Sequence, residues 1–70
     1  MSVYTAEVRV ATGDLVDRMT EMRVWLDHRH FEPLVFRYAS IGSSVQVRVE
    51  FAVEDEARAF AAEFHGKLVH

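Results

Sequence analysis

The chain has 70 residues, half of them hydrophobic, so we expect residues 1–70 to form a single domain with one core. Its 8 basic and 11 acidic side chains leave a net charge of −3, which argues against binding to nucleic acid through a broad basic surface. The absence of cysteine excludes disulfides and thiolate metal sites, so a partner subunit is the common source of extra stability that remains for so small a domain.

Hydrophobic periodicity predicts a strand and then a helix in the first half of the chain. Residues 3–10 alternate with a period of two, which is typical of a strand covered on one side. Thr12-Gly13-Asp14 ends the alternation and offers a polar helix start. An apolar stripe with helical spacing follows at Leu15, Met19, Met22 and Leu26. We expect this helix to end near residues 27–30, because Pro33 forbids its continuation.

A β-hairpin is predicted next, with strands at Leu34–Ser40 and Val45–Phe51. A two-residue loop that begins with Gly42 fits a type II′ turn, and this turn determines the strand register. On the open face the register pairs Val35 with Glu50, Arg37 with Arg48, and Ala39 with Gln46. On the apolar face it pairs Leu34 with Phe51, Phe36 with Val49, Tyr38 with Val47, and Ser40 with Val45.

The last third of the chain predicts a second helix and a short strand. Acidic residues 54–56 suit the positive end of a helix dipole. The stripe that should face the core comprises Ala57, Phe60, Ala61 and Phe64. Gly66 is expected as the C′ residue that stops this helix, and residues 67–70 as the final strand.

The predicted order is therefore βαββα with a final β, in the α+β class. One antiparallel sheet with both helices on one face would bury all of the apolar stripes. The ferredoxin-like two-layer sandwich meets this demand with right-handed crossovers, and we expect that fold. A fold of this kind does not by itself determine a function.

Three arginines are predicted on the sheet face that the helices leave open. Arg9, Arg37 and Arg48 are candidates for holding an anionic small molecule or the acidic surface of a partner protein. The simpler interpretation is a solvated face on which Glu7 and Glu50 supply the counter-charges. The strands place no aromatic side chain on this face, which disfavours RNA binding by base stacking.

Gly13 is the fourth candidate ligand-binding residue, because a glycine there would let an anion approach a helix N-terminus. The alternative is that it only relaxes a tight turn. The run Gly13-Asp14-Leu15 resembles the first loop of ACT regulatory domains, in which a strand leads through a glycine-containing turn into a helix. That resemblance implies amino-acid sensing, although the charged residues 27–30 depart from the usual glycine-rich exit of the helix.

No metal site or cofactor is expected. His28 and His30 lack a third ligand at a recognised spacing and are interpreted as exposed residues at a helix end. An enzyme would need a polar group inside a pocket between the sheet and the helices, and the candidates for this group are Tyr4, Tyr38 and His30. A small cofactor-free dimeric enzyme of the ferredoxin-like kind, with its pocket between the sheet and the helices, is the third of three hypotheses.

The first hypothesis is a non-catalytic module that self-associates as a homodimer, through the open sheet face or through the helix side that carries Val24 and Trp25. The second is an ACT-like domain that binds a small regulatory ligand. The sequence shows neither a signal peptide nor an apolar run long enough to span a bilayer, so we expect a cytoplasmic protein without membrane contact.

Overall fold

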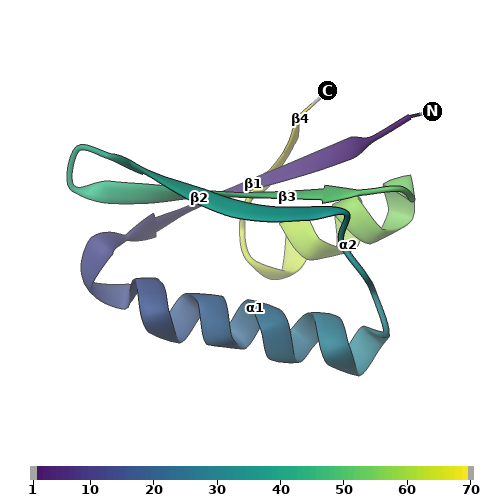
Figure 1. The fold of residues 1–70 in the computed structure, drawn as a ribbon, viewed down its shortest axis with the longest axis horizontal. Coiled ribbons are helices and arrows are strands. Elements are labelled where there is room, and N and C mark those ends of the chain that lie inside the picture. The colour runs from purple at the N-terminus through teal and green to yellow at the C-terminus, as the bar shows by residue number, and fades with distance from the viewer. Residues whose placement is uncertain (1, 70) are drawn as a thin grey trace.

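The computed structural model describes residues 2–69, which form an α+β fold with one four-stranded sheet and two helices. In chain order the elements are β1 (Tyr4–Ala11), the 3₁₀ turn η1 (Thr12–Asp14), α1 (Leu15–Arg29), β2 (Val35–Ile41), β3 (Ser44–Phe51), α2 (Glu54–Glu63) and β4 (Lys67–Val69). The sheet is antiparallel throughout, its strand order is β2-β3-β1-β4, and both helices lie against the same face (Figure 1). The predicted last strand is present, but His70 lies outside the described residues.

The hydrophobic core lies between the sheet and the helices. One face of the central strands contributes Ala6, Val8, Val10, Val45, Val47, Val49 and Phe51 to it. The stripe predicted for the second helix is confirmed, because Ala57, Phe60, Ala61 and Phe64 are all buried. In α1 the stripe is buried at Met22 and Leu26, and is only half-buried at Leu15 and Met19. None of the helices within residues 2–69 has the length and apolar character needed to cross a membrane.

The hairpin has the predicted register from residue 35 onwards, with Arg37 opposite Arg48 and Tyr38 opposite Val47. In the loop Gly42 has a φ of +61° and Ser43 does not have a positive φ, as a type II′ turn requires. The prediction that Leu34 pairs with Phe51 is wrong. The chain bends at Leu34, whose N–H bonds to the carbonyl of Glu50 at 2.7 Å.

A histidine in the left-handed conformation follows the end of each helix. His30 follows α1 with a φ of 58°, and the N–H of Phe31 bonds back to the carbonyl of Leu26 at 3.0 Å. His65 follows the end of α2 with a φ of 56°. Gly66 was expected in that left-handed position, which is a wrong prediction.

Gly66 is needed instead for a close approach between the chain and β1. A Cβ at this position would lie against the carbonyl oxygen of Glu7 and 2.7 Å from the Cγ2 atom of Val8. Its N–H also donates a hydrogen bond to the carbonyl of Ala61 at 2.8 Å, so Gly66 caps the C-terminal end of α2 together with the left-handed His65.

The start of α1 also differs from expectation. Asp14 occupies the N-cap position but makes no side-chain capping bond. The hydroxyl of Thr12 donates a hydrogen bond to the carbonyl of Ser43 at 2.8 Å. This bond connects η1 to the loop between β2 and β3.

Candidate functional site

A buried glutamate organises the open face of the sheet. Glu7 is 8% exposed although it points away from the helices. Its Oε1 atom accepts a hydrogen bond from the Nε2 atom of Gln46 at 2.8 Å. Its Oε2 atom accepts two bonds from Arg48, one from Nε at 3.1 Å and one from Nη2. The carboxylate therefore has partners on both oxygens, all of them from β3.

The two facing arginines are both neutralised within the chain. Arg48 is paired with Glu7, and the Nη2 atom of Arg37 lies 3.4 Å from the Oε2 atom of Glu50. Like charges directly opposite each other destabilise a sheet, and these two glutamates offset that repulsion. Arg37 and Arg48 also line a shallow hollow of about 290 Å³ together with Tyr38, Ala39 and Gln46.

The other two predicted ligand-binding residues lie elsewhere. Arg9 is exposed on the same sheet face, opposite Gln46. It lines a separate hollow of about 360 Å³, which contains Glu7, Val8, Gln46, His65, Gly66 and Lys67 as well. Gly13 is exposed in η1, beside the hairpin loop, and lines neither hollow. The structure thus brings Arg37 and Arg48 together, places Arg9 in the adjacent hollow, and leaves Gly13 apart.

Sequence reasoning missed His65 and Lys67 as neighbours of Arg9. The pairing of β4 with β1, which sets Lys67 opposite Glu7, brings them there. The only signal in the sequence was the expectation of a final strand at residues 67–70, which left its neighbour in the sheet open.

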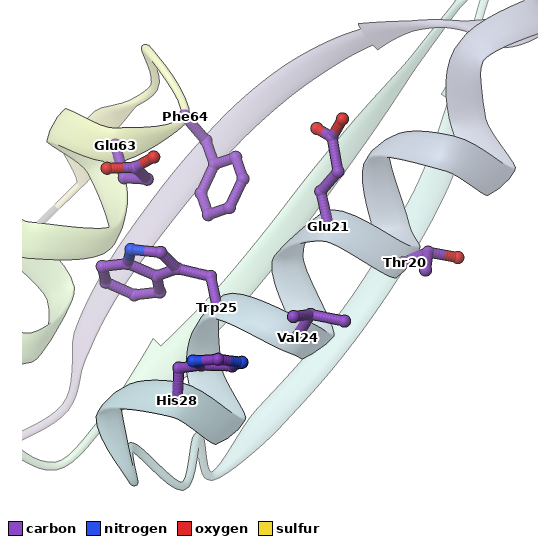
Figure 2. Close-up of a pocket in the computed structure, with 7 residues that line it drawn as sticks. All are labelled: Thr20, Glu21, Val24, Trp25, His28, Glu63 and Phe64. Carbon is purple, nitrogen blue, oxygen red and sulfur yellow. The ribbon is translucent and has the colours of Figure 1, made fainter.

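A groove of about 640 Å³ separates the C-terminal end of α2 from one side of α1. Figure 2 shows its lining residues, which are Thr20, Glu21, Val24, Trp25 and His28 from α1 with Glu63 and Phe64 from the other helix end. The indole of Trp25 packs edge-on against Phe31, Phe60 and Phe64, with ring centroids 5.6–5.9 Å apart. Trp25 is half-buried at the margin of the core, and Val24 is 50% exposed outside it.

Arginines of α1 cover aromatic rings at the edge of the core. Arg29 lies 5.1 Å from the ring centroid of Trp25, and Arg23 lies 5.0 Å from that of Phe36. Cation–π contacts of this kind stabilise a ring face that the core leaves uncovered. They also occupy ring surface that an incoming ligand would otherwise use.

β2 forms an exposed edge of the sheet. It pairs with β3 on one side, and no other strand of the described chain pairs with its second side. Tyr38 points to the helix-covered side of the sheet, as the register requires, but is 57% exposed. Helices were expected to cover this position, and that expectation is wrong: β1 and β3 contribute buried side chains to the core, whereas from β2 only the partly buried Phe36 packs against it. Leu34 and Ile41 at the two ends of the strand are also exposed, at 53% and 44%.

The remaining polar candidates do not converge. His28 lines the helix groove, and His30 occupies the left-handed position after α1. Among residues 2–69 no three histidine, cysteine, aspartate or glutamate side chains gather closely enough to hold a metal ion. That metal binding is absent or weak stays a prediction. Tyr4 is half-buried against the core, whereas Tyr38 and His30 are exposed.

Comparison with known proteins supplies no relative. No protein-family model, curated protein or solved structure matches the chain significantly. The assignment of function therefore depends on the geometry of the described residues.

Proposed function

We propose that this domain is a non-catalytic module that self-associates as a homodimer. The observation that carries the proposal is the exposed strand β2, on or beside which three large apolar side chains, Leu34, Tyr38 and Ile41, are 44–57% exposed. A strand edge that combines apolar side chains with unpaired backbone groups readily pairs with another chain. A second subunit would cover this surface and add stability to a small core.

The strand order of the sheet leaves β2 at an edge, where a second subunit could reach it. Read from the opposite edge, the strand order is β4-β1-β3-β2, and a helix spans each of the two crossovers between parallel strands. This order supports the ferredoxin-like sandwich that we propose for the chain. Such a sheet has two edges, and the one formed by β2 is seven residues long whereas the one formed by β4 has three.

The open sheet face is a weaker candidate for the dimer interface. Its facing arginines already have glutamate partners at Glu7 and Glu50. An acidic surface on a second subunit would have to compete with these internal pairs. The charges of this face therefore favour solvation over association.

Sedimentation velocity over a concentration series tests the proposal directly. We expect a monomer at low concentration and a dimer at high concentration, with the dimer retained when salt is raised. Salt screens contacts between exposed charges and leaves apolar and backbone contacts largely intact. A monomer at every concentration would reject self-association, and a dimer that dissociates at high salt would indicate a charged interface.

A second candidate function is the binding of a small anion in the hollow beside β4. The observation that favours it is that three basic residues, Arg9, His65 and Lys67, line one hollow. Glu7 lines it too, but its carboxylate is already paired with Gln46 and Arg48. Calorimetric titration with inorganic phosphate tests this candidate. Binding that disappears in Lys67→Ala and persists in Arg58→Ala, an arginine paired with Glu54 on α2, would support it, whereas no heat of binding would reject it.

A further inference from the structure

We infer that the homodimer forms by antiparallel pairing of β2 with β2 of a second copy, with the two-fold axis passing beside Tyr38. This inference rests on the proposed self-association and specifies its surface, its partner and its register. The two sheets would become one continuous sheet across both copies.

The first argument is that β2 lacks most of the devices that normally block a sheet edge. Natural edge strands are protected by charged side chains, lysine above all, by proline, by bulges or by very short length. β2 is seven residues long, contains neither proline nor lysine, and keeps an unbroken register with β3 from Val35 to Ile41. Its one charged side chain, Arg37, is paired with Glu50 of β3. Pro33 lies before the strand begins and so leaves its edge open.

The second argument concerns the direction of the backbone groups. A two-residue hairpin loop is closed by a hydrogen-bonded pair, which here is Ile41 with Ser44. Because hydrogen-bonded and non-hydrogen-bonded pairs alternate along an antiparallel ladder, Arg37 and Ala39 also bond towards β3. The N–H and C=O groups of the alternate residues then point outward, and these residues are Phe36, Tyr38 and Ser40.

The third argument is that the strand is self-complementary about its central residue. Tyr38 is the midpoint of Val35–Ile41, so a two-fold axis beside it overlaps the whole strand. The outward-bonding pairs would be Tyr38 with its copy and Phe36 with Ser40 of the second chain. The intervening pairs would be Arg37 with Ala39, which keeps Arg37 from directly facing its copy, and Val35 with Ile41, which joins two apolar side chains.

Neighbouring registers are less favourable. A two-fold axis beside Arg37 would set that arginine directly opposite its copy, and like charges in this position destabilise a sheet. An axis beside Ala39 would shorten the overlap and pair Phe36 with Gly42 of the loop. A register shifted by one residue would pair an odd-numbered residue of one strand with an even-numbered residue of the other. These side chains point to opposite faces of the sheet, so the two sheets could not join with their helices on the same side.

The pairing would also cover the side chains that the helix layer leaves exposed. An axis perpendicular to the sheet keeps the helices of both copies on the same face. Tyr38, which is 57% exposed on that face, would then contact its copy, and aromatic cross-strand pairs stabilise sheets. Ile41, which is 44% exposed on the other face, would contact Val35 of the second chain.

Cysteine cross-linking tests the register, because the chain has no cysteine of its own. In Tyr38→Cys the two introduced residues would form a hydrogen-bonded pair with Cα atoms about 5.5 Å apart, within the range for a disulfide. We expect oxidised glutathione to convert this variant into a covalent dimer. Reduction should restore the monomer on a denaturing gel.

Arg37→Cys and Val24→Cys are the matched controls. In the proposed register Arg37 is offset by two residues from its copy, so the Cα atoms would lie about 8 Å apart, beyond disulfide reach. Cross-linking of Arg37→Cys in preference to Tyr38→Cys would show a different register and overturn the inference. Cross-linking of Val24→Cys alone would move the interface to α1, and the proposed self-association would survive.

A proline variant provides a second measurement that does not depend on a thiol. Ser40→Pro removes an outward N–H group that β3 does not use, and proline is tolerated at such edge positions. We expect its dimer dissociation constant to rise roughly tenfold or more, because the symmetric pair loses two hydrogen bonds. Ser40→Ala keeps the N–H group and should dimerise like the unchanged chain.

Circular dichroism confirms that each variant is folded before its mass is interpreted. A folded Ser40→Pro variant that dimerises normally, beside a Tyr38→Cys variant that does not cross-link, would overturn edge pairing while leaving self-association intact. A wild-type chain that stays monomeric would overturn both.

Discussion

Glu7 and Arg48 lie directly opposite each other across β1 and β3, and the guanidinium donates from two of its nitrogens to one oxygen of the carboxylate. The carboxylate is 8% exposed, whereas the Arg48 side chain is 47% exposed. The pair therefore joins a buried acceptor to a donor that water still reaches. It holds the two central strands together on the face that the helices do not cover.

Replacing this carboxylate should destabilise the fold. Glu7→Gln brings an amide NH₂ group against donors from Gln46 or Arg48, so we expect the free energy of unfolding to fall by about 1–3 kcal/mol. Urea titration followed by circular dichroism measures the change. Glu50→Gln is the control, because its partner Arg37 is exposed and the loss should stay below about 1 kcal/mol. Equal losses in the two variants would contradict the special role of Glu7.

The close approach at Gly66 predicts a second effect. Gly66→Ala places a Cβ against the backbone of Glu7 and the side chain of Val8, and we expect a loss of about 1–3 kcal/mol. Gly13→Ala meets no atom within 4 Å and needs no positive φ, so its stability should change by less than about 1 kcal/mol and can increase. Thermal unfolding of both variants provides the comparison. A tolerated Gly66→Ala would show that the connection between α2 and β4 shifts at little cost.

The core predicts a larger loss at Phe60, which is fully buried between Phe51, Phe64 and Trp25. Phe60→Ala should cost roughly 3–5 kcal/mol through lost burial and a cavity, which is enough to unfold much of a small domain. Val16→Ala, at a position 77% exposed, should change stability by less than about 0.5 kcal/mol. An unchanged melting temperature in Phe60→Ala would show that the ring is not part of the core.

Because His30 is in the left-handed conformation and His28 lies inside α1, replacing each of them by glycine should change the stability in opposite directions. His30→Gly should stabilise the protein by up to about 1 kcal/mol, because glycine adopts a φ of 58° without the strain of a Cβ. His28→Gly, inside α1, should destabilise it by roughly 0.5 kcal/mol. Both variants remove one imidazole, so the difference in sign isolates the backbone conformation. Denaturant midpoints measured under one buffer condition would reveal it, and a loss in both variants would refute it.

The sequence alone determined the order of the helices and strands, the hairpin register from Val35 onwards and the buried stripe of α2. These features depend on local periodicity, and the turn at Gly42 together with the alternation of β3 leaves one register that buries one face. The stripe of α2 follows from the spacing of Ala57, Phe60, Ala61 and Phe64 in the same way.

Tertiary structure decided what depends on contacts between distant segments. Because β4 pairs with β1, Gly66 lies close to the backbone of β1, a contact that the sequence did not reveal. The same pairing places Lys67 and His65 in the hollow that Arg9 lines. The position of the helix layer left Tyr38 exposed, although its place on the apolar face was correctly predicted. Periodicity states which side of a strand a residue faces, and only the packing of the second layer decides how much of that side is covered.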